Sequence, residues 1–368
     1  MVSESEADVA EAAAEPWPDA LPWQRNLRLS FAAGRDRAHH AWLVAGPRGL
    51  GKRTLALHLA RDLLCESPTA DALACGNCDG CRYVAAGTHP DLRLIEPWRI
   101  EPDGTRVAVQ EIGIDAIRDL TGFTQITSHR RGVRVAIVAP AERLTVEAAN
   151  ALLKTLEEPP AGTILVLVSH LPGRLLATVA SRCLRIPAPR PSPAEAIAWL
   201  AGQGIATPDL ALAYAGGAPL AALRIAADGQ SGERAHWFDA LARPERLEAI
   251  AMGARIDAAD KPDRKARLEL VLDALAAWTE DLARVAGGGV PRRLPGRADA
   301  LGALAPRVAG VDLCRYHRSI VHQRAHVARP LNPRLVAESL VDAYRELFAP
   351  QPRPSGAAGS RGTGAGGG

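Results

Sequence analysis

The chain has 368 residues, 47% of them hydrophobic and 23% charged, which is ordinary for a globular protein of two or three domains. Its formal net charge of +3 is too small to indicate nucleic-acid binding by itself, and its aromatic content of 4% argues against base-stacking surfaces. No apolar run reaches eighteen residues, and the first residues are acidic where a secretory signal needs a basic region. We therefore expect a cytoplasmic protein without a membrane segment.

The two ends of the chain have compositions typical of unstructured segments. Residues 1–20 are acidic and rich in alanine, whereas residues 349–368 are rich in proline, glycine and serine. Because neither segment has enough apolar side chains to bury, we expect both ends to be disordered and to carry no chemistry.

Between the ends, the first half of the chain alternates strand-like apolar runs with helical patterns. The predicted buried strands are residues 41–45, 133–138 and 164–169. Helices are predicted at residues 52–64 and 145–157, with Thr145 as N-cap of the second helix and Pro159-Pro160 ending it. This alternation predicts a parallel sheet covered by helices on both faces.

After about residue 190 the strand-like runs stop. Amphipathic helical patterns follow, and three examples are residues 193–200, 267–286 and 333–348. The sequence thus predicts an α/β region followed by an all-α region, without a repeat of fixed period.

A glycine-rich loop follows the first predicted strand. Residues 46–54 resemble the pattern G-x-x-x-x-G-K-[ST], in which backbone N–H groups hold phosphates and the final hydroxyl binds Mg²⁺. The candidate nucleotide-binding residues are then Gly46, Gly49, Gly51 and Lys52. Arg53 stands at the hydroxyl position, and on a helix Thr54 points about 100° away from it. The sequence therefore predicts the fold of a phosphate-binding loop without productive binding of Mg·ATP.

The acidic residues that an ATPase needs at the end of a central strand are also missing from the sequence. The strand at residues 133–138 runs into Ala139-Pro140-Ala141-Glu142, without an Asp-Glu pair. Glu142 comes a few residues late, so we expect a solvated residue on the approach to the next helix. Two departures in one site argue that hydrolysis has been lost.

Four of the six cysteines lie close together in the sequence. Their spacing is Cys65-x9-Cys75-x2-Cys78-x2-Cys81, and the Cys-x-x-Cys turns contain glycine, asparagine and aspartate, which allow a tight backbone. Four thiolates complete the tetrahedral shell of a structural zinc ion. His89 is then a surplus ligand, and we expect a loop or surface histidine there.

The tripeptide Ser181-Arg182-Cys183 follows the third predicted strand by about eleven residues. An arginine at a helix end beside a sheet has two readings, which are a structural ion pair and a finger that neutralises phosphate charge in a neighbouring subunit. Composition and spacing leave both open.

These motifs together resemble one family, the clamp-loader AAA+ subunits of bacteria. The resemblance covers roughly residues 20–348. It rests on Pro22-Trp23, the loop at residues 46–54, the four cysteines, Gly87-Thr88-His89-Pro90-Asp91, the helix motif at residues 149–160 and Ser181-Arg182-Cys183. The helix motif and the cysteine spacing are specific, whereas the glycine-rich loop is shared by many families.

The resemblance implies an α/β, RecA-like AAA+ domain with a parallel sheet at residues 21–189 and a zinc-binding insert at about residues 65–81. A helical lid at residues 190–225 and an all-α collar for oligomerisation at residues 226–348 would follow. The segment Leu331-Asn332-Pro333-Arg334-Leu335 agrees with the collar.

Within the family, the degenerate positions are similar to those of a member that does not hydrolyse ATP. The gamma/tau ATPase subunits have a hydroxyl, an Asp-Glu pair and a sensor-2 arginine where this sequence has Arg53, Ala139-Pro140 and Leu220. The resemblance implies a rigid stator of the DNA polymerase III holoenzyme without ATPase activity of its own. In that role Arg182, with Ser181 and Cys183 as its motif, would act in trans on a gamma/tau site. Lys52 is absent from some such members, so its presence leaves passive nucleotide binding open.

The partners implied are the gamma/tau and delta subunits and, through the assembled complex, the sliding clamp and primed DNA. Two alternatives remain. A gamma/tau-like ATPase would turn over ATP by itself, and a zinc-module nucleic-acid-binding protein would bind DNA alone with strong salt dependence.

Overall fold

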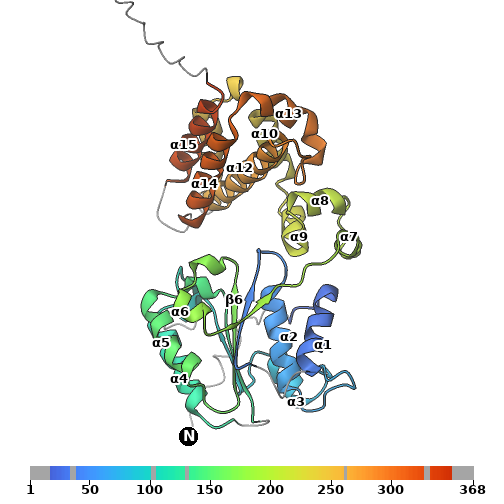
Figure 1. Ribbon diagram of the computed structural model, residues 1–368, viewed down its shortest axis with the longest axis vertical. Helices are drawn as coiled ribbons and strands as arrows, with labels where there is room; N and C mark the ends of the chain where they lie inside the picture. Colours follow the sequence, from blue (N-terminus) through green and yellow to red (C-terminus); the bar gives the residue numbers. More distant parts are fainter. Residues whose placement is uncertain are drawn as a thin grey trace, which may run out of the picture. The chain divides into compact units, whose positions relative to one another are not determined.

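The computed structural model describes residues 17–33, 39–100, 105–128, 132–260, 263–326 and 332–349. The chain divides into two compact units, Met1–Gly229 and Gln230–Gly368 (Figure 1). Most of the two predicted disordered ends, residues 1–16 and 350–368, lies outside the described residues, as does Leu331 of the collar segment.

The first unit is built on a five-stranded sheet in which every neighbouring pair is parallel, with the order β2-β5-β6-β1-β7. Its strands are β1 (Ala41–Ala45), β2 (Leu92–Ile95), β5 (Arg134–Val138), β6 (Thr163–Ser169) and β7 (Leu184–Pro187). The three predicted strands are β1, β5 and β6, which form the centre of the sheet. A separate antiparallel hairpin consists of β3 (Trp98–Ile100) and β4 (Arg106–Ala108).

Helices cover both faces of this sheet, as the alternating pattern predicts (Figure 1). One layer consists of α1 (Arg25–Ala33), α2 (Lys52–Leu64) and α3 (Asp79–Ala85), and the other of α4 (Ile114–Gln125), α5 (Val146–Glu157) and α6 (Ala177–Ala180). Strand β1 illustrates why two layers are needed. Trp42 and Val44 pack with the first layer while Leu43 packs with the second, because successive side chains of a strand point to opposite faces.

The helix ends follow from local sequence. Helix α2 has the predicted bounds and begins after Gly51, whose φ of 78° places it in the left-handed region. Helix α5 begins after Thr145, whose side chain accepts a hydrogen bond from the backbone N–H of Ala148, so the predicted N-cap is confirmed.

Three short helices complete the first unit and share a small core of Ala196, Leu200, Leu212 and Ala222. They are α7 (Pro193–Gly202), α8 (Pro208–Tyr214) and α9 (Pro219–Ala227). In the part of the chain that the structure describes, no single helix has the length and hydropathy to cross a membrane, and only the pair α8 and α9, bent by 109°, passes that test jointly.

Within its described residues, the second unit has helices and connecting loops and no strand. Its helices are α10 (Ser231–Leu241), α11 (Ala249–Asp257), α12 (Arg264–Ala286), α13 (Ala298–Leu304), α14 (Gly310–His326) and α15 (Pro333–Glu346). Trp278, in the middle of α12, is fully buried, and its indole Nε1 donates a hydrogen bond of 2.8 Å to the hydroxyl of Tyr344 in α15. The predicted change from an α/β region to an all-α region is therefore confirmed.

Candidate functional site

Several charged and polar side chains lie together at one edge of the parallel sheet. The carboxyl ends of parallel strands meet there, and open α/β sheets bind their ligands at that edge. The glycine-rich loop, residues 46–51, follows β1, Glu96 follows β2, Glu142 follows β5 and His170 follows β6. The loop predicted from the sequence therefore lies beside residues that are distant from it in the chain.

Two glycines of the loop are required by their surroundings. Gly49 has a φ of 82°, and a Cβ atom there would lie 2.6 Å from the Cβ atom of Ala221 in α9. Gly51 has a φ of 78°, and a Cβ atom there would lie 2.1 Å from Cδ1 of Leu21. The loop is thus packed closely between the segment that precedes α1 and helix α9.

The same two neighbouring segments also donate hydrogen bonds to the carbonyl groups of the loop. The side chain of Gln24 donates through Nε2 to the carbonyls of Leu50, at 3.2 Å, and Gly51, at 2.8 Å. The backbone N–H of Leu220 donates to the carbonyl of Gly49 at 3.0 Å. Leu220, at the position where the resemblance places a sensor-2 arginine, therefore contacts the loop through its backbone.

Lys52 is turned back onto the loop. Its side chain is buried, with the residue 2% exposed, and Nζ donates a hydrogen bond of 2.6 Å to the carbonyl of Pro47. Burial lowers the pKa of Lys52 to about 8, although the nearby carboxylate of Glu142 opposes the shift and Arg48 adds to it. The ammonium group thus has a protein partner within its own loop.

Arg53, at the position of the metal-binding hydroxyl, forms a bidentate ion pair with Glu96. Its Nε and Nη2 atoms lie 2.6 Å and 3.0 Å from the two carboxylate oxygens. Glu96 was not a candidate from the sequence, because it follows a short edge strand and matches no motif. The first turn of α2 therefore presents a paired guanidinium where the motif requires an oxygen ligand.

The expectation that Glu142 is a solvated residue is wrong. Glu142 is half-buried, and its two carboxylate oxygens accept the backbone N–H of His170 at 3.1 and 3.2 Å. Burial first, and then the positive charges of Lys52, Arg48 and Arg143, together lower the pKa of His170 to about 3. His170 is therefore neutral at ordinary pH, and the edge beside it is positively charged.

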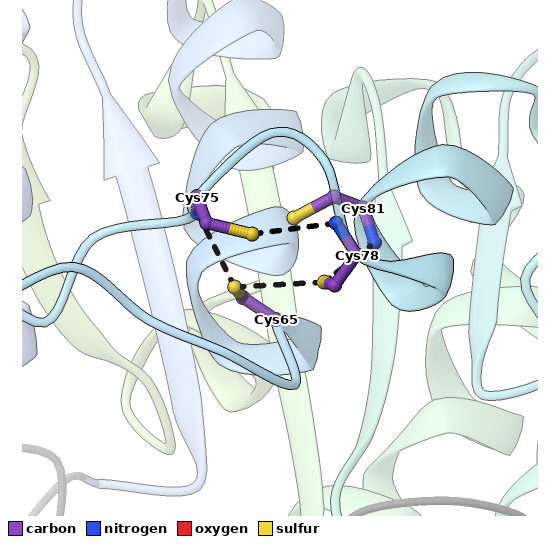
Figure 2. Close-up of side chains that lie close together, drawn as sticks. All are labelled: Cys65, Cys75, Cys78 and Cys81. Carbon is purple, nitrogen blue, oxygen red and sulfur yellow. Dashed lines mark hydrogen bonds between the residues drawn. The ribbon is translucent and has the colours of Figure 1, made fainter.

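The four cysteines converge on one point, as Figure 2 shows. Their Sγ atoms all lie within 4.8 Å of one another, and those of Cys65 and Cys78 are 3.8 Å apart. A tetrahedral ion with metal–sulfur bonds of about 2.3 Å separates its ligands by about 3.8 Å, so the cluster has the dimensions of such a site.

Backbone N–H groups surround the sulfur atoms. Cys75 Sγ accepts from Asn77 and Cys78, both at 3.4 Å, and these bonds hold the pKa of Cys75 below its ordinary value. Cys65 Sγ accepts from the backbone of Cys75 at 3.3 Å. Such donors favour thiolates, which are the form that binds metal ions. The residues present therefore fit a four-thiolate metal site.

A buried ion pair anchors this cysteine segment to α1 and α2. Arg28 binds both carboxylate oxygens of Asp62, at 2.7 and 2.8 Å, and Asp62 also accepts the backbone N–H of Ala74 at 2.8 Å. His89 lies outside the cluster but is buried, with Nδ1 accepting the backbone N–H of Asp91. Of the two expectations for His89, the loop position is therefore confirmed and the surface position is wrong, and the four-cysteine grouping is confirmed.

The predicted arginine lies on the opposite helical layer, at a corner between α5 and α6. Arg182 donates from Nη1 to the carbonyl of Thr178 at 2.9 Å, and its Nη2 lies 2.5 Å from a carboxylate oxygen of Glu157. Cys183 donates through Sγ to the carbonyl of Val179, and burial raises the pKa of Cys183 to about 11. Arg182 thus has an ion-pair partner that the sequence did not identify.

Comparison with known proteins supports the resemblance. Residues 25–191 match the family profile described as "DNA polymerase III, delta subunit". DNA polymerase III subunit delta' of Pseudomonas aeruginosa is 45% identical over 221 residues, which cover 59% of this chain and 64% of that protein. Subunit delta' of Escherichia coli is 40% identical over 214 residues, with coverages of 55% and 60%.

The chain is also similar, over a shorter stretch of sequence, to another type of subunit. DNA polymerase III subunit tau of Escherichia coli is 38% identical over 164 residues, which cover 44% of this chain and 24% of that protein. The matched stretches span less than two thirds of the length of each of these three relatives. The α/β region of the chain is therefore similar in sequence to DNA polymerase III delta-prime subunits.

Proposed function

We propose that the protein is a stator of the replicative clamp loader. It works in the cytoplasm with gamma/tau and delta subunits, and the assembled complex places the sliding clamp on primed DNA at the expense of ATP. The chain itself does not hydrolyse ATP. This assignment extends to the whole chain what the similarity of its first unit to delta-prime subunits suggests.

The ion pair between Arg53 and Glu96 carries the non-hydrolysing part of the proposal. A guanidinium has no electron pair to offer a cation, so Arg53 cannot replace the hydroxyl that binds Mg²⁺ in active loops. The end of β5 continues as Ala139 and Pro140, which supply no carboxylate for a metal ion or a water molecule. Lys52 meanwhile has a partner in the carbonyl of Pro47.

The close packing of the loop supports a rigid role. Gln24 and helix α9 bind the loop from outside it, through the carbonyls of Gly49, Leu50 and Gly51. In a nucleotide-driven subunit such contacts have to change during the cycle. A loop that binds its own lid is suited to a subunit that keeps one conformation while its neighbours move.

We assign to Arg182 the role of a finger for the nucleotide of an adjacent gamma/tau subunit. Its side chain is 37% exposed, and it lies in the turn directly after α6, a helix that is fixed by the fully buried Val179. An arginine placed in this way neutralises phosphate charge in the transition state of a neighbouring site.

We also assign Zn²⁺ to Cys65, Cys75, Cys78 and Cys81. With four protein ligands the ion has no open position, so it would supply structural cross-linking and no chemistry. The ion would hold the end of α2 against the start of α3.

ATP turnover of a reconstituted clamp loader on primed DNA tests the proposal. The chain alone is expected to show no turnover, and the wild-type chain is expected to stimulate the gamma/tau subunits. Arg182→Ala should remove the contribution of the site that it serves, because an arginine finger is worth about 10³–10⁵ in rate.

Arg174→Ala is the matched control, since Arg174 is an exposed arginine on the neighbouring short helix at Pro172–Arg174. Complexes are compared at equal assembly, measured by size-exclusion chromatography. Turnover by the chain alone would contradict the stator assignment, and equal activity of the two variants would contradict the role of Arg182.

A further inference from the structure

We infer that Glu157 is a positioning residue for Arg182, which aims the guanidinium before a neighbouring subunit is bound. The inference rests on the proposed function and deepens it. It concerns a residue that does not touch the nucleotide itself and acts only through the arginine.

The contacts of Arg182 at the corner between α5 and α6 hold its side chain in one orientation. Glu157 is the last residue of α5, and its Oε1 lies 2.5 Å from Nη2 of Arg182. The carbonyl of Thr178 accepts from Nη1 on the same guanidinium at 2.9 Å. Two acceptors on the two terminal nitrogens fix the plane of the group. Since a guanidinium has five N–H donors, it has more donors than these two contacts use, and a phosphate oxygen is a suitable further acceptor.

The two helices that hold these acceptors are packed against one core. Leu152 and Leu156 of α5 and Val179 of α6 are buried in the same cluster, and Cys183 packs against it. The backbone on both sides of the ion pair is therefore fixed, and the freedom that remains belongs to the long arginine side chain. Without an acceptor beside it, that side chain would sample several rotamers and lose entropy on engaging a phosphate.

The exposure of the pair argues for positioning and against a role in stability. Glu157 and Arg182 are 49% and 37% exposed, and exposed ion pairs contribute little to folding. A weak contact is suitable for a finger, because it orients the guanidinium without withholding its charge from the nucleotide. A strong buried pair would neutralise the arginine instead.

The test compares Glu157→Gln with Glu158→Gln in the reconstituted complex. Glu158 is the next residue, is also exposed, and loses the same charge on substitution. Glu157→Gln is expected to lower kcat of the DNA-stimulated ATPase by up to about fivefold, which is the limit for an exposed pair, with KM for ATP unchanged. Glu158→Gln should leave both constants unchanged, and Glu157→Asp should recover part of kcat.

Arg182→Ala and the double variant Arg182→Ala/Glu157→Gln complete the cycle. If Glu157 acts through Arg182, the double variant is no slower than Arg182→Ala alone. The inference is overturned if Glu157→Gln equals wild type, if Glu158→Gln loses as much, or if the two losses multiply. Should Arg182→Ala itself have no effect, the proposed function fails, and that result is distinct from a failure of Glu157 alone.

Discussion

At the scale of single residues, the glycine-rich loop at residues 46–51 differs from the loop of an active ATPase in the partners of the charged side chains that follow it. The glycines are present, and Gly49 and Gly51 have the left-handed φ values that the loop requires. Lys52 and Arg53 nonetheless bind the protein itself, through Pro47 and Glu96. The motif thus specifies the backbone, whereas chemistry depends on contacts between distant segments.

The buried position of Lys52 predicts a pH-dependent stability. Its pKa is lowered from 10.5 to about 8, so the charged form is disfavoured in the folded state. The resulting cost is fully present below pH 8 and disappears as pH rises to 10.5, where the unfolded chain also loses its proton. The first unit of the wild-type chain should therefore gain about 3 kcal/mol over that range relative to Lys52→Met.

Chemical denaturation of the full chain at several pH values between 7.5 and 10.5 measures this difference in the free energy of unfolding. Pulsed hydrogen exchange in residues 39–100 reports when the first unit unfolds. Lys154→Met is the control, because Lys154 is exposed on α5. If the free energy of unfolding changes with pH in the same way for wild type and Lys52→Met, the ammonium group of Lys52 is not desolvated in the folded state.

Residue-level prediction from sequence succeeded where ligands are close in the chain. The four cysteines lie within seventeen positions, and their spacing alone placed them together. Glu96 and Glu157 were missed because each pairs with an arginine through the tertiary fold, and an isolated glutamate has no local signal. Glu142 was misjudged for the same reason, since its partner is the backbone of His170, 28 residues away.

At the scale of elements, sequence periodicity predicted the buried centre of the sheet and missed its edges. Strands β1 and β5 are fully buried and therefore appear as continuous apolar runs. The edge strand β7 has only Ile186 buried, and β2 only Ile95, so neither has an apolar run. The hairpin of β3 and β4 was also missed, because strands of three residues are too short to show a period.

The cysteine segment is the element whose stability depends most on a ligand. Its residues 66–77 are without a helix or strand. Asp62 and Arg61 of α2 bind it at Ala74 and Gly76, and Arg25 of α1 binds it at Asp71. We therefore expect one zinc ion per chain. Removing it with a chelator under reducing conditions should make Ala72 and Ala74 accessible to elastase, while α2 and α5 stay protected.

Cys78→Ser should be cut without chelator, because it lacks one ligand. Cys314→Ser, a change of an exposed cysteine in α14, should behave as wild type. Freshly purified, reduced protein without zinc by elemental analysis would count against the assignment, as would equal cleavage rates with and without chelator.

At the scale of the whole molecule, each of the two units has a core of its own. The first unit buries both faces of its sheet, and the second buries Trp237, Trp278 and Tyr344 among its helices. Separate cores predict separate unfolding, because stability belongs to each cooperative unit. The predicted boundaries of lid and collar, at residues 190–225 and 226–348, remain predictions.

The hydrogen bonds of Tyr344 allow this independence to be tested. Its hydroxyl accepts from Trp278 at 2.8 Å and donates to the carbonyl of Leu241 at 2.9 Å, and all three residues are fully buried. Tyr344→Phe leaves one donor and one acceptor buried without this partner, which costs about 2 kcal/mol.

Hydrogen exchange measured by mass spectrometry reports on both units in one experiment. Tyr344→Phe should raise the opening constant of α12 and α15 by roughly thirtyfold, because 1.4 kcal/mol is a factor of ten. Exchange in β1, β5 and β6 should stay unchanged. Tyr83→Phe, on α3 of the first unit, is the matched control and should leave α12 and α15 at the wild-type rate. Faster exchange in both units of the Tyr344 variant would mean that they unfold together and that their cores are not independent.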